Sequence, residues 1–286
     1  MPTVRIACHQ LAPVVGELDA NRAAALAAID AAAAAGARVV VLPELVSSGY
    51  VLRDAEEARS LAEPADGPTL AGWAERAASY ELVVAGGFAE LGTDGRLYNS
   101  AALVDASGVR AVYRKAHLWD REKLFFAPGD ELPPVVDTAH GRIGLVVCYD
   151  LEFPEWTRGV ALRGAELLCV PTNWPREVRP AGERPMEVMR AMVAASTNRI
   201  VVAACDRCGT ERDVDWVAGS AIAGPDGWLL AGPPAAAAPQ LLLADADLAT
   251  ARDKSIGPRN DVLADRRTDL YGRAEALEPI SRGASG

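Results

Sequence analysis

Short apolar runs rich in Val, Ile and Leu alternate with Ala-rich amphipathic stretches along almost the whole chain. Runs of this kind are typical of buried strands, and stretches with an apolar face at helical spacing are typical of helices. Strands that alternate with helices and hairpins favour a mixed sheet covered by helices. We therefore predict an α/β fold, with strands near residues 3–10, 37–45, 81–88, 96–115, 142–148, 165–171, 199–205, 219–232 and 240–248.

Helix signals fall in the intervals between these strands. Gly36 follows an amphipathic stretch and is a residue that commonly stops a helix. Pro154 stands where a helix would begin, at the position that proline favours. The sequence predicts helices over residues 17–36, about 55–80, 154–164 and 184–197.

The bulk composition limits the possible partners. Half of the 286 residues are hydrophobic and the formal net charge is −10, without a block of Lys or Arg, which argues against broad contact with nucleic acid or anionic lipid. No apolar stretch approaches the roughly 18–20 residues that a membrane helix needs. The N-terminus lacks the pattern of an export signal. We expect a cytoplasmic protein without nucleic-acid or membrane partners, with one domain over 1–275 and a flexible tail over 276–286.

The cysteines do not form a disulfide framework. Cys8, Cys148, Cys169, Cys205 and Cys208 are scattered, odd in number and mostly within apolar runs. This pattern is typical of reduced thiols. The pair Cys205 and Cys208 is a single CxxC without a second pair or a nearby histidine, so we expect no metal there.

Two polar residues follow apolar strands directly. Cys148 lies where a predicted strand ends, and a sulfur at such a position can face a cleft, although a buried structural cysteine is the commoner case. Glu44 follows Pro43 at the exit of another predicted strand. A carboxylate there is costly to bury without a partner, although it can also simply emerge into water. Each residue is a candidate on position alone.

Two further charged residues are candidates of a weaker kind. Lys115 closes a predicted strand in a chain with only three lysines among 29 basic residues. Its compact ammonium can stabilise a developing oxyanion or lower the pKa of a thiol, but for this residue by itself a solvated strand end is the better explanation. Glu122 lies in the polar loop HLWDREKLFFAPGD, where exposed charge is the ordinary explanation.

Taken together, these residues lie in three ordered segments that resemble a known family. VVLPEL at 40–45, YRKAHL at 113–118 and VVCYDLEFPEW at 146–156 are similar to the signature segments of the nitrilase, or carbon–nitrogen hydrolase, superfamily. Their order, Glu then Lys then Cys, and their spacing also fit. The resemblance spans about residues 3–271 and includes the segments 122–130, 163–175, 220–227 and 259–271.

The resemblance implies a single-domain α-β-β-α sandwich that pairs into homodimers or larger homo-oligomers. It also implies a role for each matching residue. Glu44 would be the general base, Lys115 the oxyanion stabiliser and Cys148 the nucleophile. Glu122 would be the additional glutamate that positions substrate, and the backbone N–H of Tyr149 would be the second oxyanion donor. The resemblance implies no metal and no organic cofactor.

Within the superfamily, CYDLEFPEW and PTNWP most resemble amidases that act on small carboxamides. The expected partner is therefore a small-molecule amide, with thioester chemistry releasing acid and ammonia. A nitrilase acting on a C≡N group and an N-carbamoyl amidohydrolase are the alternatives. A non-hydrolytic acyltransferase or a binding subunit is an alternative of a different class. The predicted pocket residues are Tyr50, Trp119, Asn173 and Trp174.

Overall fold

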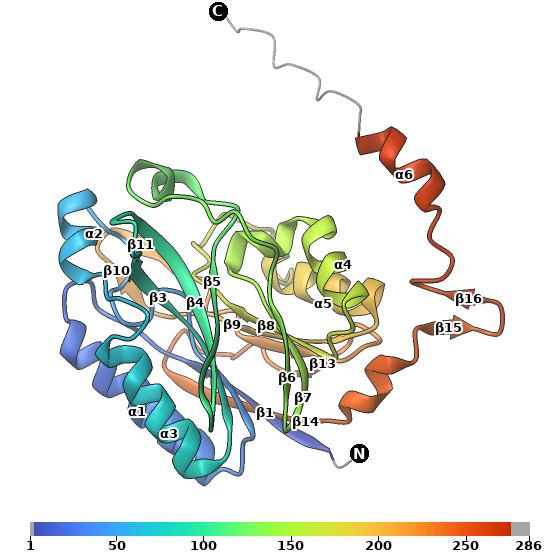
Figure 1. Cartoon of the computed structure of the whole chain (residues 1–286), viewed down its shortest axis with the longest axis horizontal. Helices are drawn as coiled ribbons and strands as arrows, with labels where there is room; N and C mark the ends of the chain where they lie inside the picture. The colour runs from blue at the N-terminus through green and yellow to red at the C-terminus, as the bar shows by residue number, and fades with distance from the viewer. Residues whose placement is uncertain (1–2, 276–286) are drawn as a thin grey trace, which may run out of the picture. The chain divides into compact units, whose positions relative to one another are not determined.

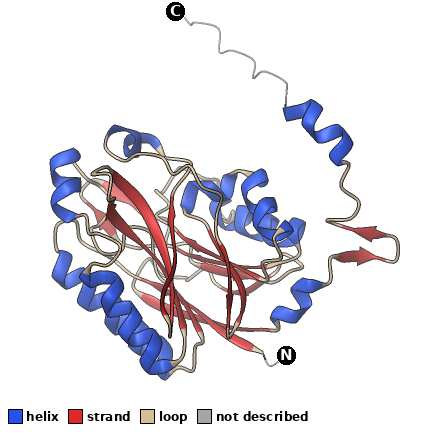
Figure 2. Ribbon diagram, viewed as in Figure 1, coloured by secondary structure: helices blue, strands red, loops and turns tan. Residues whose placement is uncertain are grey.

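The computed structural model describes residues 3–275 and divides the chain into two compact units, Met1–Asp253 and Lys254–Gly286. The first unit contains two six-stranded sheets with helices on their outer faces, as Figures 1 and 2 show. The predicted α-β-β-α sandwich is confirmed for this unit. The expected tail over 276–286 lies outside the described residues.

The first sheet combines a parallel centre with antiparallel edges. Strands β1, β2 and β3 are parallel, whereas β14, β4 and β5 pair antiparallel with their neighbours. Parallel strands buried on both faces read as continuous apolar runs, which is why the sequence predicted them well. Across the sheet the order is β14 (Gln240–Ala246), β1 (Val4–Gln10), β2 (Val39–Val41), β3 (Val83–Leu91), β4 (Leu97–Asp105) and β5 (Gly108–Arg114).

The second sheet repeats this plan. Strands β7, β8 and β9 are parallel, and β6, β12 and β13 extend the sheet antiparallel on either side. Across the sheet the order is β13 (Leu229–Ala231), β12 (Ala221–Ala223), β9 (Val201–Cys205), β8 (Leu167–Pro171), β7 (Gly141–Leu145) and β6 (Val135–Thr138). Strand β2 packs against β8 and β9, so the carboxyl ends of strands from both sheets lie in one region.

Side-chain alternation explains the layers. Val39 and Val41 of β2 pack in the core between the sheets, whereas Val40 faces the layer of helices with Trp73. Successive side chains of a strand point to opposite faces, so one apolar strand serves both cores. Figure 1 shows the outer helices, α1 (Leu18–Ala34) and α3 (Pro68–Tyr80) on one side and α4 (Pro154–Leu162) and α5 (Met186–Asn198) on the other.

The predicted helix over 55–80 is wrong in one respect, because the structure breaks it into α2 (Ala55–Leu61) and α3. Pro64 and Pro68 explain the break, since proline disfavours helical backbone at the residue before it. The Glu63 carboxylate accepts a hydrogen bond from the backbone N–H of Thr69, in the first turn of α3. Pro68 is tolerated as the first residue of α3 because an N–H at that position would have no partner within the helix.

The remaining elements are short. The hairpin strands β10 (Thr210–Glu211) and β11 (Val214–Asp215) and three 3₁₀ helices, η1 (Asp120–Leu124), η2 (Cys148–Glu152) and η3 (Leu248–Arg252), belong to the first unit. The second unit contains β15 (Ser255–Gly257), β16 (Asn260–Asp261) and α6 (Thr268–Glu275). Within residues 3–275, no helix has the length and apolar character needed to cross a membrane.

Candidate active site

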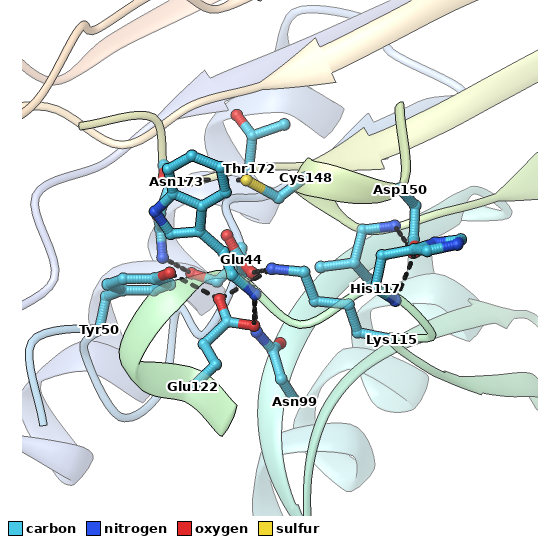
Figure 3. A network of polar contacts seen from close by, with 12 residues as sticks. Glu44, Tyr50, Asn99, Lys115, His117, Glu122, Cys148, Asp150, Thr172 and Asn173 are labelled. Carbon is cyan, nitrogen blue, oxygen red and sulfur yellow. Dashed lines mark hydrogen bonds and ion pairs between the residues drawn. The ribbon is translucent and has the colours of Figure 1, made fainter. Parts of the chain in front are cut away.

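The structure brings the four candidate residues together (Figure 3). The Lys115 ammonium lies 2.7 Å from Glu44 Oε1 and 2.8 Å from Glu122 Oε1. Glu44 and Lys115 are fully buried and Glu122 is 3% exposed. Buried charges persist when they are paired, so one ammonium between two carboxylates accounts for their burial. The solvated readings that the sequence left open for Glu44, Lys115 and Glu122 are therefore wrong.

Cys148 occupies an unusual turn beside this cluster. It begins η2 three residues after the end of β7, and its φ of 47° lies in the left-handed region that residues with a side chain rarely adopt. Its Sγ lies 3.8 Å from the backbone oxygen of Asn173, which follows β8. Strained backbone of this kind is common at active sites and ligand-binding sites.

Glu44 has one restrained carboxylate oxygen and one without a protein partner. Asn99 Nδ2 donates to Oε1 at 2.7 Å, on the same oxygen that Lys115 contacts. Asn173 Nδ2 donates to the Glu44 backbone oxygen at 2.8 Å. Oε2 is buried and accepts no hydrogen bond from the described residues. The geometry thus fixes the carboxylate while leaving Oε2 able to accept a proton.

Burial and mutual charge set the protonation states. Burial raises the pKa of Glu44 to about 7, although the Lys115 charge opposes this shift. Burial alone would lower the pKa of Lys115, but the carboxylates of Glu122 and Glu44 hold it well above its usual value. Burial and the Glu44 charge raise the pKa of the Cys148 thiol. At neutral pH the cluster therefore combines an ammonium, a thiol and a carboxyl group that can gain or lose a proton.

Glu122 is held by two of its neighbours. The Tyr50 hydroxyl donates to its Oε1 at 2.6 Å, and the Trp119 backbone N–H donates to its Oε2 at 3.1 Å. Tyr50 and Trp119 were predicted as pocket residues, and the structure gives each of them this additional contact. Asn173, predicted in the same role, is 1% exposed and contacts Glu44 and Cys148.

Asp150 was not among the predicted site residues. Its buried carboxylate accepts from the backbone N–H of Val147 at 3.1 Å and from the Tyr113 hydroxyl at 2.9 Å. It also accepts from the backbone N–H of His117 at 3.1 Å and lies 2.7 Å from His117 Nδ1 (Figure 3). Asp150 therefore ties the turn of Cys148 to the segments on both sides of Lys115.

Two small cavities open beside the cluster. One of about 120 Å³ is lined by Cys148 together with Trp119, Tyr149, Trp174 and charged residues at its mouth. The other, of about 140 Å³, is lined by Tyr50, Trp119, Glu122 and apolar side chains. Trp119 and Pro175 line both cavities. Three of the four predicted pocket residues, Tyr50, Trp119 and Trp174, therefore line a cavity at this site.

The part of the chain that the structure describes shows no set of side chains arranged to bind a metal ion. No group of three or more His, Cys, Asp or Glu side chains among residues 3–275 is arranged to hold an ion. The five cysteines are buried free thiols.

Comparisons with known proteins identify the family of the chain. A nitrilase of Pyrococcus abyssi is 35% identical over 94% of this chain and 100% of its own length, and an (R)-stereoselective amidase of a Pseudomonas species is 35% identical over 77% of each chain. The crystal structure of an amidase from a Nesterenkonia species superposes with a TM-score of 0.78 at 27% identity, over 96% of this chain and 97% of that one. The sequence profile of the carbon-nitrogen hydrolase family matches residues 5–254. The chain belongs to the carbon–nitrogen hydrolase family, and it is an enzyme that hydrolyses carbon–nitrogen bonds other than peptide bonds.

Proposed function

We propose that the protein is a cysteine-dependent amidase that converts a small carboxamide into a carboxylic acid and ammonia through a thioester at Cys148. One observation carries this proposal: a single buried ammonium, Lys115, joins Glu44 and Glu122 beside the strained turn of Cys148. This set supplies a nucleophile, a base and an oxyanion donor without an imidazole.

The first half of the reaction uses the Glu44 oxygen that has no protein partner. Glu44 Oε2 takes the thiol proton of Cys148, and the sulfur attacks the amide carbon to form an S–C bond. Lys115 uses two of its three N–H donors on carboxylates, so the third can stabilise the oxyanion, with the backbone N–H of Tyr149 as the second donor. Protonated Glu44 then gives its proton to the amide nitrogen, the C–N bond breaks and ammonia leaves.

The second half regenerates the thiol. Glu44 accepts a proton from a water molecule, whose oxygen attacks the thioester carbon. Lys115 and the Tyr149 N–H stabilise the second oxyanion as they did the first. The C–S bond breaks, the carboxylic acid is released, and the proton on Glu44 returns to the Cys148 sulfur. No step in this cycle changes an oxidation state, so the residues present are sufficient.

Relatives support the amide as substrate class. Solved structures of a mutant of the Nesterenkonia amidase record Michael addition of acrylamide, and covalent addition of the acetamide moiety of fluoroacetamide, at its active-site cysteine. A nitrilase and plant N-carbamoylputrescine amidases are also among the relatives, so the test must separate the three chemistries.

Ammonia release from matched panels of small amides, nitriles and N-carbamoyl compounds tests the proposal, with Cys148→Ala as the blank. We expect release chiefly from amides. Release chiefly from nitriles or N-carbamoyl compounds would keep the catalytic residues and reject the amidase assignment. Rapid iodoacetamide labelling of Cys148 without turnover on any of the three panels would favour a transferase or a binding subunit.

The pH dependence of kcat/KM follows from the raised pKa of Glu44. The ionised form of Glu44 is the base, so activity should rise as the pH increases through about 7 and fall tenfold for each pH unit below it. Initial rates on an uncharged amide between pH 5 and pH 9 provide the measurement. Full activity at pH 5 would show that Glu44 is not the base.

Glu122→Gln should slow turnover by about 10²-fold, a typical loss when one electrostatic partner of a reacting group is removed. The variant should also move the acid limb of the pH profile to lower pH, because the Glu122 charge contributes to the raised pKa of Glu44. The exposed Glu131→Gln, from the same loop, is the matched control. Equal kcat and an equal acid limb in the two variants would remove Glu122 from the mechanism.

A further inference from the structure

The segment Cys205–Cys208 begins at the last residue of β9 and has no role in the proposed reaction. Its two charged residues, Asp206 and Arg207, are nevertheless almost completely buried, at 0% and 1% exposure. Burying charged groups is costly unless hydrogen bonds or ion pairs compensate. Asp206 and Arg207 contact two different sets of residues. Each set includes a residue that contacts the cluster around Lys115.

Asp206 holds the loop that follows β8. Its Oδ1 accepts hydrogen bonds from the backbone N–H of Trp174 and from its neighbour Arg207, each at 2.9 Å. Its Oδ2 accepts from the backbone N–H of Gly219 at 2.8 Å. A carboxylate that receives three backbone donors fixes the segments that carry them.

The loop held by Asp206 contacts both the thiol and the base. Asn173 directly precedes Trp174, its backbone oxygen lies 3.8 Å from Cys148 Sγ, and its side chain donates to the Glu44 backbone at 2.8 Å. A displacement of this loop would therefore move the Cys148 sulfur relative to the Glu44 carboxylate. Positional errors of about 1 Å between reacting groups can lower rates by about 10²-fold.

Arg207 acts on the opposite side of the cluster. Its Nη1 lies 2.8 Å from Glu211 Oε2 in the hairpin of β10 and β11. The same Glu211 oxygen accepts from the backbone N–H groups of Tyr50 at 2.9 Å and Val51 at 2.7 Å. Tyr50 in turn donates its hydroxyl to Glu122. The Arg207 guanidinium also lies over the Trp216 ring, which packs edge-on against Tyr50.

We propose that Asp206 and Arg207 are positioning residues for the two halves of the active site. Asp206 sets the loop of Asn173 against Cys148 and Glu44, and Arg207 sets Tyr50 against Glu122 through Glu211. The inference rests on the proposed role of Cys148 as nucleophile. It gives the 205–208 segment a function that involves neither metal nor disulfide chemistry.

The Asp206 half is tested by comparing Asp206→Ala with Asp206→Asn. Folded wild type and both variants are treated with iodoacetamide, and the alkylation rate of Cys148 is followed by peptide mass spectrometry. This assay requires no substrate. We expect Asp206→Ala to lower this rate and kcat by about tenfold or more. Asp206→Asn keeps an oxygen for Trp174 and Arg207 and should stay within about threefold of wild type.

Cys208→Ala is the matched control, since it removes a buried side chain of the same segment without touching either set of contacts. Folded Asp206→Ala with wild-type alkylation and kcat would overturn the proposal, as would equal losses in the Ala and Asn variants. If Asp206→Ala does not fold, Asp206→Leu replaces it, because leucine fills the volume without an acceptor. Wild-type enzyme that releases no ammonia from any small amide would instead contradict the proposed function.

The Arg207 half is tested with Arg207→Met and Tyr50→Phe. Each single change should lower kcat by about tenfold, and the double variant should lose no more than the larger single effect, because both act on Glu122 through one path. Asp213→Asn, which changes an exposed charge in the same hairpin, is the control with unchanged kcat. A loss of kcat in the double variant equal to the product of the two single losses would overturn this half of the proposal.

Discussion

Cys148→Ala is expected to fold normally and to release no ammonia from any substrate of the wild-type enzyme. The change removes only the sulfur, so the cavity is small and the expected cost in unfolding free energy is about 1 kcal/mol. The thioester cannot form without the sulfur, so water must attack the less reactive amide directly. Ammonia release together with a urea unfolding curve checks both parts of the prediction.

The buried Cys169→Ala is the matched control for this experiment. Cys169 lies in β8 with 0% exposure and no contact to Lys115 or Glu44, so its loss should lower stability and preserve kcat. Cys148→Ser should remain nearly inactive, because a hydroxyl is much harder to deprotonate than a thiol. Ammonia release by Cys148→Ala at a rate close to that of the wild type would refute the thioester mechanism.

The sequence identified the residues at the ends of strands. Glu44 and Cys148 each interrupt an apolar run after β2 and β7, and Lys115 directly follows β5 in a chain with only three lysines. Such an interruption can be read locally, and the order of the three segments then pointed to the family. The apolar runs also predicted the strands, because strands buried on two faces are continuous in the sequence, whereas the two-sheet sandwich was implied only by the resemblance to the family.

The sequence did not identify the residues whose role depends on distant partners. Asn99 lies inside β4 and meets Glu44, 55 positions away, only after β2, β3 and β4 have paired. Its signal was a polar residue within the apolar run LYNSAALV, which also carries Ser100 without a contact to the site. Asp150 and Asp206 each accept backbone N–H groups from separate segments, so no spacing along the chain reveals them.

The structure also separates two kinds of buried charge that look alike in the sequence. Glu90 is as buried as Glu122, but its carboxylate is paired with Arg114 and Ser100 and leaves no acceptor free for substrate. Glu44 instead keeps one buried oxygen without a protein partner beside a thiol. Glu211 Oε1 is also buried without a hydrogen-bond partner, so the neighbouring thiol together with the free oxygen, rather than either feature alone, marks the reacting carboxylate.

Lys115→Met is expected to abolish turnover and to lower stability markedly. Removing the ammonium leaves Glu44 and Glu122 buried without their counter-charge, a loss that typically costs about 3–5 kcal/mol. One of the carboxyl groups should then take up a proton at neutral pH, and the oxyanion loses its charged donor. We expect kcat to fall by about 10³-fold or more and iodoacetamide to label Cys148 slowly.

The double variant Lys115→Met/Glu122→Gln separates the structural from the chemical role of Lys115. Replacing one carboxylate by an amide removes part of the uncompensated charge, so urea unfolding should show recovery of much of the lost stability. Turnover and Cys148 labelling should remain low, because neither substitution restores a cation near the sulfur. Turnover that recovers in parallel with stability would show that Lys115 acts only by holding the two glutamates, and would leave the Tyr149 N–H as the principal oxyanion donor.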